Sequence, residues 1–348
     1  MATGQGLEMN LRNGRYATLL LAAAALLLAA NGCSGEDGSD PGETGGGRVF
    51  LSIGTAPQGG AFYPVGGAIA EVMNRHGGDW GWQVTAEATK GTQENIRRLV
   101  SGELDMAMAN AAITYFAVRG EAGWDQAYPM RSIMTLAPNV ALFVTAAGGA
   151  VNTLADLKGR RVVVGPDGAG FHFFITPLLE AHGVTYEDFT PLYNTQFGAV
   201  EMLSNGSAAA AFLGGAVPTA SITQAATSRD LHFVPFDPDR RVELIENYPF
   251  FRAATIPAGT YRGMDTDYEG LDVGSMHLIT VESADEDLIY RATKTIYDNR
   301  EEVTASHRAG RAINPKNVIR DTGTPFHPGA IRFYREIGIW PEESAAAH

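Results

Sequence analysis

The chain has 348 residues, of which 45% are hydrophobic and 19% are charged, and its formal net charge is −13. This composition is ordinary for a soluble globular protein with one large or two medium domains. The acidic balance argues against nucleic acid as a partner, because surfaces that bind nucleic acid carry stripes of Lys and Arg.

The first 33 residues have the layout of a secretory leader. Arg12 and Arg15 precede an apolar run over residues 16–30, which is too short to span a bilayer comfortably. Cys33 is the only cysteine and resembles the acylated cysteine of bacterial lipoproteins, although Asn31 replaces the usual small apolar residue. We expect lipid attachment at Cys33, with a plain leader and an incidental cysteine as the alternative. Residues 34–47 are rich in Gly, Ser, Asp and Glu and predict a flexible tether.

Strands and helices alternate in the first part of the body. The pattern predicts strands over 48–55, 82–88 and 104–109, and helices over 64–76, 93–101 and 111–118. Pro64 suits a first helical turn, Thr92 is a good N-cap and Gly102 stands in the place of a C-cap. This alternation predicts a parallel sheet with right-handed crossovers.

The same pattern starts again after an expected crossing strand over 133–146. We expect a helical turn at 154–157, strands at 161–164 and 208–213, and helices at 171–182 and 198–205. Leu99-x-x-Gly102 before a strand recurs as Leu203-x-x-Gly206, which favours two similar α/β lobes. Chance similarity between two strand-helix-strand units is the alternative. Further helices are expected over 284–304 and from 325–330 to about Gly338.

Motifs for catalysis or metal binding are missing from the sequence. It contains no HExxH, CxxC, Walker loop or GxSxG motif, and its eight His residues show no metal spacing. A dinucleotide site is disfavoured because Gln58-Gly59-Gly60 lacks the GxGxxG order. We therefore expect no enzyme activity, no cofactor and no metal.

Glycine-rich loops at strand ends are the remaining candidates for a site. Glycine allows the backbone to approach a ligand closely, and a helix start presents free N–H groups. Loops of this kind follow the strands that end near Gly54 and Val164, and Thr89-Lys90-Gly91 opens another helix. Asn110 and Gly214-Gly215 end equivalent strands of the two halves, so these loops are expected to line one crevice.

These residues resemble a known family. The run from Ile53-Gly54-Thr55 through Gly59-Gly60-Ala61-Phe62-Tyr63-Pro64 to Gly66-Gly67 is similar to the opening signature of TAXI-type solute receptors of TRAP transporters. Further similar segments are Glu87-Ala88-Thr89 with Glu94-Asn95, Leu154-x-Asp156-Leu157-Lys158-Gly159, Ala211-Phe212-x-Gly214-Gly215, Ile256-Pro257-Ala258-Gly259-Thr260-Tyr261 and Pro325-x-His327-Pro328-Gly329-Ala330. The similarity covers residues 48–340 in order.

The resemblance implies a two-lobed, periplasmic-binding-protein-like fold of type II, in which each lobe is a mostly parallel sheet flanked by helices. Residues 48–139 and 278–348 are expected in lobe I and residues 140–277 in lobe II, with the second crossover between 254 and 280. It also implies capture of a small organic acid (a dicarboxylate, a keto acid or a glutamate-like compound) at the extracytoplasmic side of the membrane. The partner implied is an ion-gradient-driven TRAP permease.

The loops and the resemblance together predict the ligand-binding residues. They are Gln58, Gly59, Gly60, Phe62, Tyr63, Thr89, Lys90, Gly91, Asn95, Asn110, Asn139, Gly168, Ala169, Gly170, His172, Gly214 and Gly215. Lys90 stands where the family usually has a small residue, and Asp167 to His172 replaces a Ser/Thr-containing glycine loop. We hypothesise that Lys90 binds an anionic group, and its alternative is a solvent-facing lysine.

Two other functions stay open at this point. The same fold serves ligand-sensing receptors that signal to a membrane kinase, and a neighbouring permease gene would distinguish the transport function. An enzyme on this fold, such as a lyase or transferase, would require a nucleophile or an acid/base pair that the sequence does not supply.

Overall fold

The computed structural model describes residues 47–341, whose strands form two five-stranded sheets and one two-stranded sheet. The expected leader, Cys33 and nearly all of the expected tether lie outside the described residues. Within the described part of the chain, no helix is both long and apolar enough to cross a membrane.

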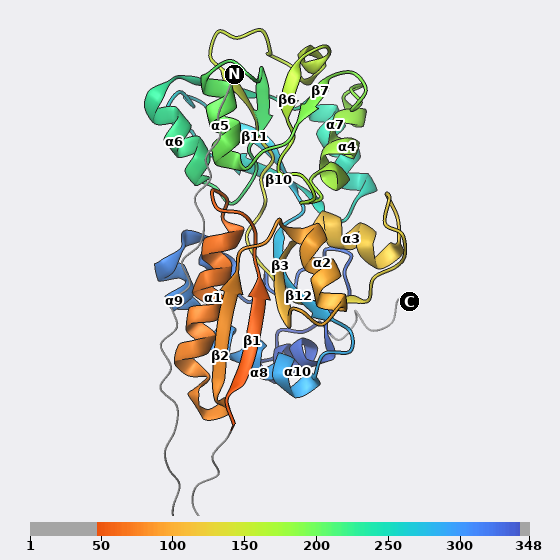
Figure 1. Cartoon of the computed structure of the whole chain (residues 1–348), viewed down its shortest axis with the longest axis vertical. Coiled ribbons are helices and arrows are strands. Elements are labelled where there is room, and N and C mark those ends of the chain that lie inside the picture. The colour runs from red at the N-terminus through yellow and green to blue at the C-terminus, as the bar shows by residue number, and fades with distance from the viewer. Residues whose placement is uncertain (1–46, 342–348) are drawn as a thin grey trace, which may run out of the picture. The chain divides into compact units, whose positions relative to one another are not determined.

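The first sheet has the strand order β2-β1-β3-β12-β4. Its strands are β1 (Val49–Gly54), β2 (Trp82–Glu87), β3 (Met106–Asn110), β4 (Met130–Thr135) and β12 (Met276–Val281). β12 pairs antiparallel with both β3 and β4, so four strands share one direction and β12 opposes them. The helices of this part are α1 (Phe62–His76), α2 (Thr92–Val100), α3 (Ala111–Arg119), α8 (Glu286–Asp298), α9 (Arg300–Ser306) and α10 (Pro328–Glu336) (Figure 1). We call this sheet and its helices lobe I.

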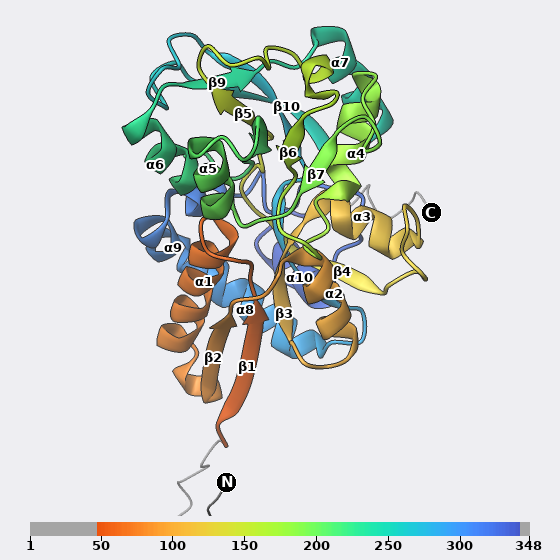
Figure 2. The same ribbon diagram turned by 45° about the horizontal axis from the view of Figure 1, so that its top comes forward.

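The second sheet repeats this arrangement with the order β7-β6-β8-β5-β9. Its strands are β5 (Phe143–Ala146), β6 (Arg161–Val163), β7 (Thr190–Leu192), β8 (Ala210–Phe212) and β9 (Leu231–Val234), and β5 opposes the other four. Its helices are α4 (His172–Ala181), α5 (Gln196–Ser204), α6 (Ala220–Ser228) and α7 (Pro238–Asn247), as Figure 2 shows. We call this part lobe II. The recurrent Leu-x-x-Gly segments occupy equivalent places, at the ends of α2 and α5.

Two segments connect the sheets and are hydrogen-bonded to each other. One runs from β4 to β5 over residues 136–142, and the other leads from the antiparallel pair β10 (Phe251–Ile256) and β11 (Tyr268–Val273) into β12. The N–H of Val273 donates to the carbonyl oxygen of Asn139 at 3.0 Å, and the N–H of Ala141 donates to that of Leu271 at 2.8 Å. Short 3₁₀ turns lie at η1 (Gly78–Trp80), η2 (Leu154–Leu157) and η3 (Arg308–Ala312).

The apolar side chains that are buried recur at the spacing expected for each helix. α1 buries Val65, Ile69, Val72 and Met73, which share one helical face, against the first sheet. A second core fills lobe II and continues into α3. There the rings of Phe116 and Phe173 stack with centroids 6.1 Å apart, so α3 of lobe I packs against α4 of lobe II.

The predicted fold class is confirmed, and the first six strands and helices lie within one or two residues of their predicted bounds. The single strand expected over 133–146 is wrong, because β4 and β5 belong to different sheets and the chain crosses between them. The helix expected over 284–304 is two helices, which meet at Asn299. Thr92 is not the N-cap of α2, because Gly91 takes that place with φ of 124°. The lobe boundaries after residues 139 and 277 remain predictions.

Candidate functional site

A cavity lies among loops that follow the strand ends of both sheets. Its volume is about 50 Å³ as space open to the centre of a water molecule. The lining residues are Ala56, Pro57, Gln58, Gly60, Ala61, Phe62, Lys90, Gly91, Thr92, Asn110, Asn139, Pro166, Phe171, Phe174, Gln196, Gly214 and Gly215. Since one water requires about 10–15 Å³ measured in this way, the space fits several water-sized groups. We call this cavity the cleft.

The loop after β1 depends on glycine at its two ends. A Cβ on Gly54 would lie 2.8 Å from Oδ1 of the buried Asn95 side chain, so only glycine fits where the strand ends. Gly59 has φ of 104°, a conformation that side chains disfavour. α1 then begins at Phe62 without a side-chain cap, which leaves N–H groups of its first turn available near the cleft.

Asn95 and Thr89 hold the strand ends together behind the cleft. Asn95 Nδ2 donates to the carbonyl oxygens of Thr55 at 2.8 Å and Met108 at 2.9 Å, which joins β1 to β3. Thr89 Oγ1 donates to Thr55 O and accepts from the N–H of Gly91. Both side chains are buried and neither lines the cleft. Their hydrogen bonds therefore shape the loops that the ligand would meet.

Asn110 has a structural task at the edge of the cleft. Its Oδ1 accepts from the N–H of Ala112 and Ile113 and so caps α3. Its Nδ2 donates to Gly274 O at 2.7 Å, in the segment that leads into β12. The backbone N–H of Asn110 donates to Thr92 Oγ1 at 2.9 Å. The Thr92 hydroxyl therefore binds the end of β3 and does not cap α2. The Asn110 side chain thus links α3 to the second connecting segment.

The two lobes touch at the rim of the cleft. The N–H of Gln93, in the first turn of α2, donates to Ala169 O of lobe II at 3.4 Å. A Cβ on Gly91 would lie 3.3 Å from the Cβ of Ala169, and one on Gly170 would lie 3.2 Å from the Cβ of Gln93. On the other side, a Cβ on Gly59 would lie 2.9 Å from the Phe197 ring. Glycine therefore permits the close approach of the lobes.

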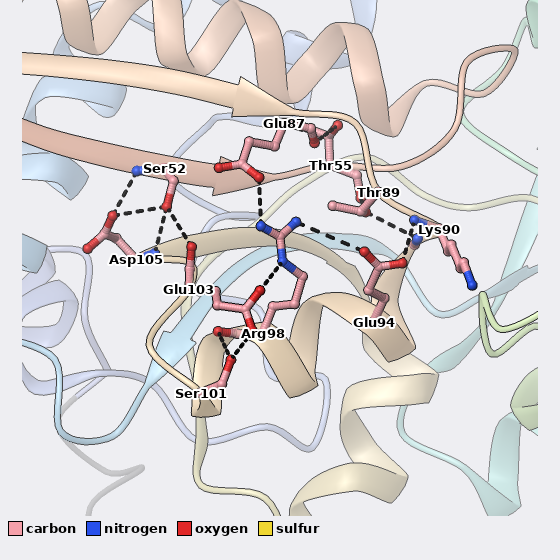
Figure 3. A network of polar contacts seen from close by, with 11 residues as sticks. Ser52, Thr55, Glu87, Thr89, Lys90, Glu94, Arg98, Ser101, Glu103 and Asp105 are labelled. Carbon is pink, nitrogen blue, oxygen red and sulfur yellow. Dashed lines mark hydrogen bonds and ion pairs between the residues drawn. The ribbon is translucent and has the colours of Figure 1, made fainter.

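Lys90 is the one charged side chain among the lining residues. It is exposed, and its ammonium group has no carboxylate partner among residues 47–341. The Glu87 carboxylate accepts from Arg98 at 2.7 Å, and Glu94 lies 4.0 Å from Arg98 and accepts from the backbone N–H of Lys90 at 3.1 Å. Figure 3 shows the Lys90 ammonium pointing away from this network. The cleft therefore carries one positive charge and no negative charge.

Two amide side chains add polar groups to the lining. Both ends of the Gln196 amide already have partners within the protein. Its Nε2 donates to Gly214 O at 2.6 Å, and its Oε1 accepts from Ser221 Oγ at 2.8 Å. Asn139 is 6% exposed, and its side-chain amide has no hydrogen-bond partner within the described residues. The amide atoms keep some accessible surface, so they can form hydrogen bonds with a polar ligand group in the cleft. Phe62, Phe171 and Phe174 supply apolar surface.

The structure brings nine of the predicted residues into the cleft lining: Gln58, Gly60, Phe62, Lys90, Gly91, Asn110, Asn139, Gly214 and Gly215. The other predicted residues lie outside it. Gly59, Gly168, Ala169 and Gly170 belong to the rim contacts and their loops, Thr89 and Asn95 lie behind the loops, and Tyr63 and His172 lie on the first turns of α1 and α4 without lining it.

Sequence reasoning missed eight lining residues: Ala56, Pro57, Ala61, Thr92, Pro166, Phe171, Phe174 and Gln196. Gln196 carried a usable signal, because it follows Thr195, a good N-cap, at the start of α5. The described residues contain no group of three or more His, Cys, Asp or Glu that could hold a metal ion.

The comparisons with known proteins agree with this architecture. The model of the NMT1-like family matches residues 53–338, and the chain belongs to that family. Among solved structures, a protein from Bordetella bronchiseptica RB50 is similar with a TM-score of 0.51 and 14% identity, over 86% of this chain and 93% of that one. PhnD1 from Prochlorococcus marinus (MIT 9301), solved in complex with methylphosphonate, is similar with a TM-score of 0.51 and 12% identity, over 83% and 95%. At these identities the likeness shows the two-lobed fold alone.

Proposed function

We propose that this protein is an extracytoplasmic solute-binding protein of the TAXI type. It captures a small organic acid, of the dicarboxylate, keto-acid or glutamate-like class, in the cleft and delivers it to an ion-gradient-driven TRAP permease. Membership of the NMT1-like family, the two-lobed fold and the TAXI-like motifs of the sequence support this proposal.

The single observation that carries the ligand class is the charge of the cleft lining. Lys90 is its one ionic side chain and has no carboxylate partner among the described residues. An ammonium group gains a charge-assisted hydrogen bond when it meets a carboxylate, and such a bond is about twice as strong as a neutral one. The Asn139 amide and the open N–H groups at the start of α1 add donors for further ligand oxygens.

Apolar surface in the cleft fits the carbon skeleton of such an acid. Phe171 and Phe174 contribute from lobe II and Phe62 from lobe I, so a ligand between them contacts both lobes. A ligand that binds the closed arrangement more tightly than an open one shifts the protein towards closure. In this proposal the ligand is released unchanged.

The export route is part of the same proposal. The leader over residues 1–33, acylation of Cys33 and the tether over residues 34–47 would hold the binding protein at the membrane face. Mass spectrometry of the N-terminal peptide of the mature protein tests this directly. A diacylglyceryl-modified Cys33 supports the anchor, and a mature chain that starts elsewhere contradicts it.

The function is tested by ligand screening and one substitution. A thermal-shift screen of organic acids identifies compounds that raise the melting temperature, since a ligand specific for the folded state stabilises it by mass action. Calorimetry with the best compound then compares the wild type with Lys90→Gln. We expect the dissociation constant to rise about tenfold or more in this variant.

Lys158→Gln is the matched control, because it removes the same charge outside the cleft, where Lys158 pairs with Asp188 at 3.8 Å. It should bind the acid like the wild type. Equal affinity of the Lys90 variant and the wild type would reject the assignment of Lys90. Conversion of the acid into a product during the titration would reject the whole proposal.

A further inference from the structure

A second group of cationic side chains lies outside the cleft, where the two connecting segments meet lobe I. Arg252 of β10, Lys316 and Arg320 line an open hollow of about 250 Å³ together with Pro138, Ala253, Asp272 and Asn317. Such a concentration of positive charge is unusual in a chain with 39 acidic and 26 basic residues. It calls for a partner, because like charges held together repel one another.

The three cations share a single carboxylate, Asp272, which interacts with Arg320 and Arg252. Arg252 and Lys316 form no ion pair with any residue between 47 and 341. The hollow contains one carboxylate, Asp272, which is 2% exposed. Its oxygens already accept from the N–H of Asn139 at 3.0 Å and from Ser275 Oγ. Three cations against one enclosed carboxylate leave the hollow with a net positive charge.

Arg320 adds an independent sign of a missing acceptor. Its Nε donates to Asn317 Oδ1 at 3.2 Å, and its Nη2 donates to Ser275 Oγ. Its Nη1 is buried and has no hydrogen-bond partner in the described part of the chain. A guanidinium nitrogen without an acceptor is costly, and a turn of the Arg320 side chain that brings Nη1 to the hollow would let an oxyanion supply that acceptor.

The positive surface continues beyond this hollow. A neighbouring hollow of about 550 Å³ shares Pro138, Ala253 and Asn317 with it and is lined by Arg308 and Arg311. These two cations also lack an ion pair within residues 47–341. They would attract an anion towards the hollow without touching it there.

We propose that Arg252, Lys316 and Arg320 form a binding site for a small oxyanion, such as phosphate, sulfate or the anionic group of a small metabolite, separate from the cleft. The site joins parts of the fold that belong to different sheets. Asn317 Nδ2 donates to the carbonyl oxygens of Thr135 and Leu136, which ties the Lys316–Arg320 loop to the end of β4, whereas Arg252 lies on β10. A bound anion therefore bridges lobe I and the β10–β11 pair. This inference does not depend on the function proposed for the cleft.

Titration of the purified protein with inorganic phosphate at constant ionic strength tests the site. We expect saturable binding of one phosphate per chain in the wild type. Arg252→Gln and Lys316→Gln should each raise the dissociation constant about tenfold or more, since each removes a charged donor. Neither side chain makes an ion pair with a described residue, so both variants should keep the wild-type melting temperature without phosphate.

Arg311→Gln is the matched control, because it removes one charge from the same surface but not from the hollow. Its dissociation constant should change by less than about threefold, as expected for a screened charge at a distance. Equal weakening by all three variants would mean diffuse attraction and would overturn the proposal. Absence of saturable binding, or binding that is lost in Lys90→Gln instead, would overturn it as well.

Discussion

His277 allows a quantitative prediction about acid stability. It lies in β12, is 0% exposed, and burial lowers its pKa to about 3 from 6.5. Thr114 Oγ1 donates to Asn110 O, so it accepts from His277 Nε2 at 2.9 Å. Nδ1 is buried and has no partner within the described residues. A second proton would go to Nδ1, where no acceptor is available and Arg320 adds unfavourable charge.

The lowered pKa of His277 means that acid reduces the free energy of unfolding. The unfolded chain takes up this proton as the pH falls below about 6.5, whereas the folded protein does not until about pH 3. Stability is therefore unaffected by His277 above pH 7 and falls progressively as the pH decreases through this window. Each pH unit is worth about 1.4 kcal/mol, so the loss at pH 4.5 relative to pH 8 is about 2.7 kcal/mol.

Urea unfolding of the wild type and His277→Gln at pH 8, 6 and 4.5 measures this contribution. The variant should be less stable at pH 8, because it disturbs a packed site, but its deficit should shrink by about 2.7 kcal/mol between pH 8 and 4.5. Comparing differences between the two proteins cancels the titration of other groups. A deficit that stays constant over this range would refute the reasoning, since His277 would then titrate equally in both states.

Three further predictions concern single positions. Asn110→Ala should reduce the free energy of unfolding by about 2–4 kcal/mol in urea denaturation, because it removes the cap of α3 and leaves the Gly274 carbonyl without its donor; a loss below about 0.5 kcal/mol would contradict this role. Asp272→Asn should be more favourable for stability at pH 7 than at pH 4, by up to about 3 kcal/mol, since burial raises the pKa of Asp272 to about 6 from 3.8 and the wild type loses stability as the pH rises through that range; the same effect at both pH values would contradict the shift. Gly170→Ala should weaken ligand binding in calorimetry more than Gly168→Ala does, because both residues have positive φ but only the Cβ on Gly170 presses on Gln93 and Ile113 across the rim, at 3.2 Å; equal losses would mean that backbone strain alone matters.

Local patterns were sufficient for much of lobe I. The alternation of strand, glycine loop and helix from β1 to α3 appears directly in the residue order, because each of these elements is formed by neighbours in the chain. The split between β4 and β5 was missed because residues 133–146 form one mainly apolar run, and pairing partners far away in the sequence decide which sheet each half joins. The consecutive strands β10 and β11, which pair with each other across residues 257–267, were not predicted either.

The candidate site was predicted in part for a similar reason. Lys90 and the loop glycines were found because they follow predicted strand ends, where ligands meet open α/β sheets. Phe171 and Phe174 were missed because only the tertiary arrangement turns their side chains into the cleft. For Thr92 the local pattern was misleading. It was predicted to cap α2, but its hydroxyl accepts from the N–H of Asn110 instead.

The most direct test of the account is a crystal structure of the protein with the organic acid that stabilises it most. The account predicts the acid between the two lobes, with a carboxylate oxygen within hydrogen-bond distance of Lys90 Nζ and its carbon skeleton against Phe171 and Phe174. An acid bound elsewhere on the surface, or one held in the cleft with its carboxylate remote from Lys90, would contradict it.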